Sequence, residues 1–303
     1  MTAPPRGVIH DLGYRGFDGR RLGDGAITLE LFRTSLAHAF GIGRSGKAKI
    51  MPWTIIVLMT VPAVVLGALS IQAGRLPDGT PGASAPSGYF GYPYWTQLLI
   101  TIFVATQAPV LFARDLRYRT IVLYFARPVS RARFVLTRLA ALTTAIFLVI
   151  IGPMLVWFAC ALSTGIDPGQ HARRFGAAFV GVAVLALVLA ALAALVSTIA
   201  TKSGLALAAV IVALMVPSAM ITVALTVTTE LQRDGVGQLI ASLHPFTVVA
   251  LLVSGLFGDP PSNGNIPQPE GWVAVTAAVG ACVAWVVLPT LALVARMRRV
   301  ASL

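Results

Sequence analysis

The stretch FGAAFVGVAVLALVLAALAALVSTIA, residues 175–200, contains 26 residues and no charged side chain. A helix needs about 20 consecutive apolar residues to cross the hydrocarbon core of a bilayer, because each residue advances it by about 1.5 Å. An uncharged run of more than about 18 residues indicates a membrane span rather than the buried helix of a soluble domain. We therefore predict a transmembrane helix over 175–200.

Further apolar runs of similar length occur along the chain. Together with 175–200 they predict six transmembrane helices, the other five covering roughly 51–73, 94–113, 139–162, 204–229 and 271–295. Hydrophobic residues make up 57% of the 303-residue chain and charged residues 11%, which excludes a soluble enzyme and a disordered regulator. The two cysteines lie far apart in apolar runs, which excludes a disulfide scaffold. The expected fold class is an all-α integral membrane protein.

Basic residues are distributed unevenly between the two predicted sides of the membrane. With a cytoplasmic amino terminus, 19 of the 23 Lys and Arg residues fall inside, and four fall outside: Arg75, Arg173, Arg174 and Arg233. Cytoplasmic loops carry the excess of basic residues, so both termini are predicted to be cytoplasmic. Basic residues that lie between apolar runs argue against nucleic acid binding. The strong preference for Arg over Lys indicates a bacterial coding bias, so we expect the plasma (inner) membrane of a bacterium.

The segment between the fifth and sixth predicted spans, 230–270, contains an apolar stretch that is too short to span. The sequence LIASLHPFTVVALLVSGLF, residues 239–257, is broken by His244-Pro245, which leaves about a dozen apolar residues after the break. A seventh span would place the Arg-rich carboxyl-terminal tail outside, against the charge bias. We predict an outer loop that holds a short re-entrant hairpin.

A short helix is predicted before the first span, over residues 26–40. Its sequence AITLELFRTSLAHAF places Leu29, Phe32, Leu36 and Phe40 on one face. About 15 residues are too few to span, so we predict an amphipathic helix along the inner leaflet, with a soluble packing helix as the alternative.

The linker after this helix, GIGRSGKA at 41–48, matches the start of a phosphate-binding loop. Ala48 stands where a Ser or Thr would hold magnesium, and no strand precedes the glycines, so we interpret it as a basic linker at the lipid headgroups. The predicted organisation is a cytosolic leader over 1–25, the amphipathic helix and linker over 26–46, and the six-span domain over 47–303.

The predicted spans contain no formally charged side chain. Ion-coupled carriers and membrane enzymes use carboxylates, histidines or metal ligands at that depth. We therefore expect no catalytic residue and no metal site, and transport would need energy from elsewhere. Prolines interrupt five of the spans and allow kinks. Six residues are candidates for a pathway or hinge, with ordinary packing as the alternative: Pro62, Thr106, Gln107, Pro153, Pro217 and Thr222.

The connection between the second and third spans is RDLRYRTIVLYFARPVSRARFVLTR, residues 114–138. Thr120 can cap a short helix that ends at Arg127-Pro128, because the residue before proline disfavours the helical conformation. Ser130 can cap the next helix, which continues into the third span. The basic residues here suit lipid headgroups, whereas the apolar short helix suits a protein groove; the second interpretation is favoured.

This connection resembles the corresponding segment in permease subunits of ATP-binding-cassette transporters of the type-two, exporter class. The matching positions are Asp115, Thr120, Leu123, Arg127, Pro128, Val129, Ser130 and Arg131. Arg119 and Thr137-Arg138 depart from the family pattern, which usually has Gly and Gly-Lys there. The amphipathic helix, the six spans and the hairpin-bearing outer loop also resemble the family.

The resemblance implies a mechanism and partners. Residues 115–131 would be a coupling element that fits a groove on a separate ABC ATPase, and that partner would hold ATP and magnesium. Two permease chains, identical or paralogous, would enclose the path. The hairpin turn would contain His244, Pro245 and Phe246. Uncharged spans favour export of a hydrophobic or amphipathic substrate, and the alternative is a membrane anchor or assembly factor that moves no solute.

Overall fold

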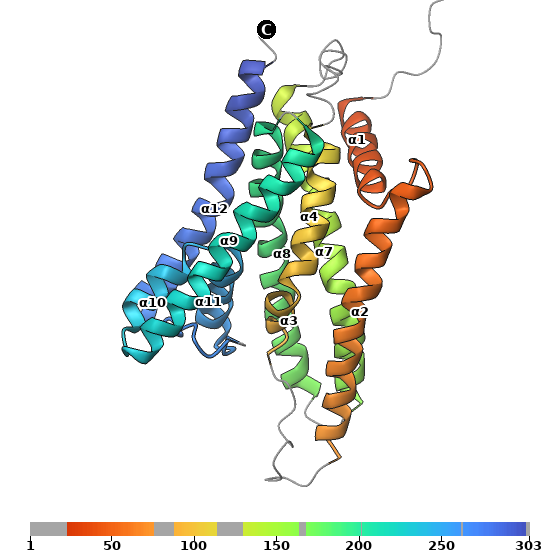
Figure 1. Ribbon diagram of the computed structural model, residues 1–303. Helices are drawn as coiled ribbons and strands as arrows, with labels where there is room; N and C mark the ends of the chain where they lie inside the picture. Colours follow the sequence, from red (N-terminus) through yellow and green to blue (C-terminus); the bar gives the residue numbers. More distant parts are fainter. Residues whose placement is uncertain are drawn as a thin grey trace, which may run out of the picture.

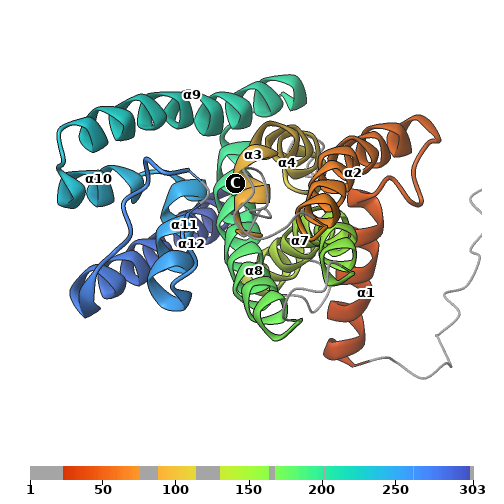
Figure 2. The ribbon, with the colours of Figure 1, turned by 90° about the horizontal axis from the view of Figure 1, so that it is seen from below.

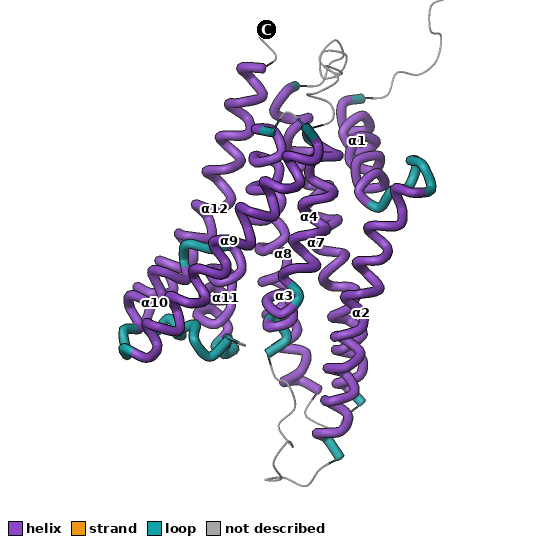
Figure 3. Tube along the Cα trace, in the orientation of Figure 1, coloured by secondary structure: helices purple, strands orange, loops and turns teal. Residues whose placement is uncertain are grey.

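The computed structural model describes residues 23–75, 88–113, 130–163, 168–200, 202–261 and 263–300, and its regular elements there are all helices (Figure 3). Labelled as in Figure 1, they are α1 (Asp24–Ala39), α2 (Lys47–Ala73), α3 (Gly91–Trp95), α4 (Gln97–Leu111), α7 (Arg131–Leu162), α8 (Pro168–Ile199), α9 (Ser203–Glu230), α10 (Asp234–Ala241), α11 (Pro245–Phe257) and α12 (Gly271–Val300). The predicted all-α class is confirmed for these residues.

Five of these helices, α2, α7, α8, α9 and α12, are long and apolar enough to cross a membrane. The run predicted as the second span, 94–113, is divided at Thr96 into α3 and α4. The 15 residues of α4 extend about 22 Å, which is less than the hydrocarbon thickness of about 30 Å. The Thr96 hydroxyl donates to the carbonyl of Tyr92 at 2.8 Å across the break. The count of six spans stays a prediction.

Helix α8 is the centre of the helix arrangement (Figure 2). It packs against α4, α7, α9, α11 and α12. In its most apolar window 56% of the residues are buried, against 22% in α12. Ala186, Ala190 and Ala194, spaced by four, are fully buried. Small side chains let neighbouring helices approach closely, which is what holds helices together where lipid is as apolar as the side chains.

The outer surfaces of the peripheral helices are apolar. Along α9, Val212, Val216, Met220 and Val223 are each more than half exposed, and α2 presents a similar row of valines. Contiguous apolar surface of this extent is unstable in water and is satisfied by acyl chains. The protein is therefore a multi-pass membrane protein.

The two ends of the helix bundle differ in charge. In Figure 1 one end, here called the inner end, carries α1, the start of α7 and the end of α12. Described basic residues at the inner end are Arg33, Arg44, Lys47, Lys49, Arg133, Arg138, Lys202 and Arg296, while those of the opposite, outer end are Arg75, Arg173, Arg174 and Arg233. The predicted orientation would place the inner end in the cytoplasm, and it stays a prediction.

Helix α1 packs against α7 and α4, and part of its predicted apolar face takes part in this packing. Ser35 and Ala39 are its buried residues, whereas Leu29 is 48% exposed. The small side chains allow close contact with α7, and Leu36 and Phe40 pack at the edge of this contact. The placement of α1 at a lipid surface stays a prediction.

Helices α10 and α11 are joined through Ser242–His244, inside the predicted outer loop. Pro245 occupies the first turn of α11, where its missing N–H is not needed. The Thr247 hydroxyl donates to the Ala241 carbonyl at 2.6 Å and links the two helices. His244 Nε2 and the Leu214 carbonyl of α9 are 3.0 Å apart. Ten of the 13 residues of α11 are buried, so this pair of helices is packed into the protein; its re-entrant depth stays a prediction.

At the outer end, Asp259 follows α11 and is only 6% exposed. Its Oδ1 lies 3.9 Å from Nε of Arg174 and has no hydrogen-bond partner among the described residues. Burial raises the pKa of Asp259, and the positive charges of Arg174 and Arg173 oppose that shift only in part.

We expect the substitution Gly181→Ala to destabilise the contact between α8 and its neighbours. A Cβ at this position would lie 2.5 Å from Cγ2 of Val253 and 2.7 Å from the ring of Phe90. Overpacking of this kind costs about 1–3 kcal/mol. Thermal unfolding in detergent, followed by reaction of a thiol dye with the buried Cys282, measures the effect. Gly176→Ala on the same helix, which has open space, is the control, and equal melting of both variants would contradict the expectation.

Asp259 predicts a specific pH dependence of stability. Because its pKa is raised above the ordinary value of 3.8, its contribution to stability is full below that value and is lost as the pH rises through the raised pKa. The Asp259→Asn variant has no carboxyl group to ionise, so it does not lose stability in this way. The unfolding temperature of the variant is therefore expected to rise relative to that of the wild type as the pH is raised above about 4. A difference that does not change with pH would show that the carboxylate is not destabilising.

Candidate functional site

The connection predicted to dock a partner enters the third span through a capped helix start. Asp115, Thr120, Leu123, Arg127, Pro128 and Val129 lie outside the described residues, whereas Ser130 and Arg131 lie within them. The Ser130 side chain accepts a hydrogen bond from the backbone N–H of Arg133 at 3.2 Å, as the sequence predicts. The cap satisfies one of the free N–H groups at the start of α7 and fixes where this helix begins.

Arg138 joins the two helices that flank this connection. It is 8% exposed, and its guanidinium donates to the carbonyl of Leu111 at the end of α4. Its Cζ lies 4.4 Å from the centroid of the Phe134 ring. The last carbonyls of a helix have no partner within it, and a cation there is favoured by the helix dipole. Arg138 therefore fixes the end of α4 to the start of α7.

An ion pair connects α1 to the same region. Nη1 of Arg133 lies 2.7 Å from Oδ2 of Asp24, with side chains that are 41% and 60% exposed. Exposed pairs contribute about 0–1 kcal/mol, so this contact orients α1 on α7 more than it stabilises the fold.

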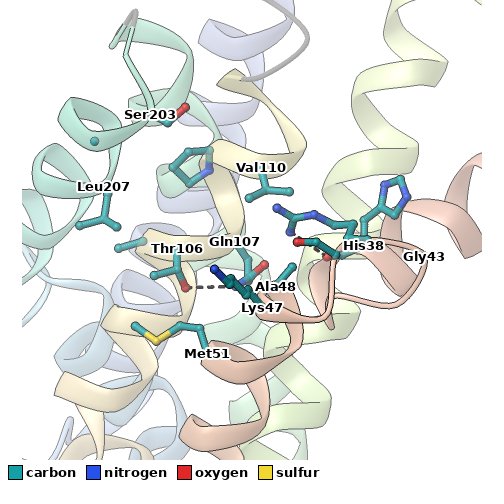
Figure 4. Close-up of a pocket in the computed structure, with 15 residues that line it drawn as sticks. His38, Gly43, Lys47, Ala48, Met51, Thr106, Gln107, Val110, Ser203 and Leu207 are labelled. Atoms are coloured by element: carbon teal, nitrogen blue, oxygen red, sulfur yellow. Dashed lines mark hydrogen bonds between the residues drawn. The ribbon is translucent and has the colours of Figure 1, made fainter.

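A cleft of about 900 Å³ opens between the α1–α2 linker, α4 and the start of α9 (Figure 4). We call it the inner cleft. Its lining residues are His38, Gly43, Arg44, Ser45, Lys47, Ala48, Met51, Ala105, Thr106, Gln107, Pro109, Val110, Ser203, Gly204 and Leu207. The segment 41–48, which the sequence predicts to be a basic linker, forms one wall of the inner cleft.

Two of the predicted pathway residues, Thr106 and Gln107, line this cleft. The Thr106 hydroxyl donates to the carbonyl of Ile102 at 2.9 Å, and its oxygen accepts from Nε2 of Gln107 at 3.2 Å. Gln107 is 4% exposed, and its Oε1 has no hydrogen-bond partner among the described residues. An unpaired buried amide oxygen costs free energy unless a ligand or water completes it.

The other predicted pathway and hinge residues do not line the inner cleft. Pro62, Pro153 and Pro217 lie inside α2, α7 and α9, respectively. The Thr222 hydroxyl donates to the carbonyl of Ser218 on its own helix at 2.9 Å. This bond is what the alternative of ordinary packing predicts for such a hydroxyl group. The structure therefore brings Thr106 and Gln107 together and leaves the remaining four residues apart from them.

The residues that sequence reasoning missed are Arg44 and Lys47 of the linker. A sequence signal was present, since both follow glycines directly before a membrane span. Only the fold shows that this linker faces α4 and α9.

The sequence profile described as "ABC-2 family transporter protein" matches residues 26–299. The chain belongs to the ABC-2 transporter family. Comparison of the sequence with curated proteins gives no match. The family match covers α1 through nearly all of α12, so the ABC-2 assignment applies to the whole described helix bundle.

Membership identifies the chain as a membrane component of an ABC-2 transporter, a class that associates with an ABC ATPase. Among the described residues, no group of three His, Cys, Asp or Glu side chains is arranged to hold a metal ion. The described features of this ABC-2 chain that bear on function are the contacts of Ser130 and Arg138 and the inner cleft.

We expect Arg138→Met to weaken the junction between α4 and α7. The variant leaves the Leu111 carbonyl without its donor in a buried place, which costs about 1–3 kcal/mol. Thermal unfolding in detergent tests this. Arg133→Met is the matched control on the same helix, because its ion pair is exposed and is worth less than about 1 kcal/mol. If the two variants melt together, Arg138 does not hold the junction.

Proposed function

We propose that this chain is the membrane-spanning permease subunit of an exporter that is driven by a separate ABC ATPase. The family match over 26–299 carries the proposal. The resemblance of 115–131 to the coupling element of such permeases assigns this segment as the docking site. Support also comes from the inner end, where Ser130 caps α7 and Arg138 holds α4.

The contacts at the inner end suggest how movement of the ATPase is transmitted. Both ends of the 114–129 segment join helices that Arg138 connects, so a displacement of the segment moves α4 and α7 together. Helix α7 in turn packs against α2 and α8. Pro109 and Pro153 each remove a backbone hydrogen bond in α4 and α7, which allows these helices to bend.

The proposal includes the architecture of the complete transporter. The second apolar run crosses the membrane as α3 and α4, which makes six spans with both termini in the cytoplasm of a bacterium. Two permease chains enclose the path, and ATP and magnesium are bound by the ATPase. The substrate is hydrophobic or amphipathic, since the only Asp or Glu in the five long described helices is Glu230, the last residue of α9.

The principal experiment is reconstitution with the ABC ATPase that copurifies from the native membrane. ATP-dependent efflux of hydrophobic or amphipathic dyes from proteoliposomes is expected. Copurification of the ATPase without flux of any dye or phospholipid would favour the alternative, a membrane anchor or assembly factor. The absence of an ATPase in the purified complex would contradict the proposal.

We expect Arg131→Glu, at the start of α7, to reduce ATPase copurification by roughly tenfold or more, because a reversed charge in the docking segment opposes a complementary surface. The yield of ATPase per permease, quantified by mass spectrometry, measures this. Arg233→Glu is the control, because Arg233 is exposed before α10 at the outer end. Equal retention of the ATPase by both variants would place the docking surface elsewhere.

A further inference from the structure

The inner cleft has the electrostatic character of an anion site. Arg44 and Lys47 line it, and none of the described lining residues is acidic. The Arg44 guanidinium donates to the carbonyl of His38 at 3.4 Å. Cations at the inner end of a membrane protein attract the negative surface of the adjacent leaflet.

Two long helices also begin at this cleft. Lys47 is the first residue of α2 and Ser203 is the first residue of α9, and both line it. Neither helix start has a side-chain cap. The positive end of the helix dipole at each start favours an anion. In the first turn of α2 the N–H groups of Ala48 and Lys49 already donate to the carbonyls of Ser45 and Gly46, so α2 contributes its dipole and the Lys47 side chain.

A buried polar group on the wall formed by α4 indicates a second requirement, which is that the ligand carries a hydrogen-bond donor. Figure 4 shows Gln107 directed from α4 toward the wall that Lys47 and Ala48 form. Its Nε2 is used by Thr106, and its buried Oε1 has no partner among the described residues. An amide oxygen accepts hydrogen bonds and does not donate them, so it calls for a ligand with a donor, such as a hydroxyl group.

The remaining wall is apolar. Met51, Val110 and Leu207 come from α2, α4 and α9. A ligand that enters from the inner leaflet can keep an acyl chain against these side chains and the bilayer while its headgroup reaches Lys47 and Gln107.

We propose that the inner cleft binds the headgroup of an anionic amphiphile that carries a hydroxyl group next to its phosphate, of the phosphoglycerol kind. Arg44, Lys47 and the start of α9 hold the phosphate, and Gln107 Oε1 accepts from the hydroxyl group. This inference rests on the proposed function, for which it names the substrate class.

Binding is tested on the purified wild-type chain in nanodiscs of phosphatidylcholine, without any ATPase. Retention of three added lipids is measured by native mass spectrometry: phosphatidylglycerol, phosphatidylethanol, which has the same charge and no headgroup hydroxyl, and labelled phosphatidylcholine. We expect retention in that order, with roughly tenfold between the first and the last. Free glycerol 3-phosphate distinguishes a lipid site from a site for soluble phosphate, because competition at equal concentration would show that the acyl chain contributes nothing and would overturn the assignment.

Variants locate the site. Lys47→Gln is expected to reduce phosphatidylglycerol retention about tenfold, whereas Lys49→Gln, exposed on the same helix and outside the cleft, leaves it unchanged. Gln107→Leu is expected to abolish the preference for phosphatidylglycerol over phosphatidylethanol while both remain above phosphatidylcholine. Equal retention of all three lipids by the wild type, or an equal effect of both lysine variants, would overturn the inference.

The failures of the two proposals are distinguishable. Selective binding by the lone chain without ATP-dependent flux in the reconstituted complex would sink the proposed export function and leave the headgroup site standing. Flux of dyes with no selectivity among the three lipids would do the reverse.

Discussion

Hydrocarbon provides no hydrogen-bond partner for a peptide group, so the chain must satisfy its own backbone wherever it lies within the bilayer. Helices meet this requirement, and hydroxyl groups such as those of Thr60 and Thr106 bond back to their own helix. Few polar groups are left to join one helix to another. The hydrogen bonds that join different helices are therefore informative. They include those of Trp157 with Ser70, Tyr92 with Met59, Ser218 with Gln97, and His244 with Leu214.

The same constraint explains why packing depends on small residues. Lipid is as apolar as leucine, so helices gain little by hiding apolar side chains from it and more by close contact. The alanines of α8 and Gly181 permit this contact on several sides, and α8 becomes the helix around which α4, α7, α9, α11 and α12 are arranged. The apolar faces of α2 and α9 are left to lipid.

Helix α4 connects the two features of the inner end. Arg138 holds the carbonyl of Leu111 in the last turn of α4. Gln107 lies one turn earlier, about 6 Å along the helix from Leu111. Under the proposed function, a force on the docking segment that displaces Leu111 also displaces Gln107 and the wall of the inner cleft that α4 forms. ATPase movement and headgroup binding are then coupled through a single rigid element, with no need for a long pathway of side chains.

The sequence by itself determined the membrane class, the five long helices, the Ser130 cap and the distribution of charge between the two ends. These are local properties, since the length of an apolar run, a capping side chain and a flanking Arg act within a few residues of where they stand. The break at Thr96, the burial of Ser35 and Ala39 in α1, and the role of Arg138 were not predictable, because each depends on which helix lies alongside. The inner cleft was decided only by the tertiary structure. Its cations, its helix starts and its unpaired Gln107 oxygen are separated by up to about 160 residues in the chain, and they become one site only when α2, α4 and α9 meet.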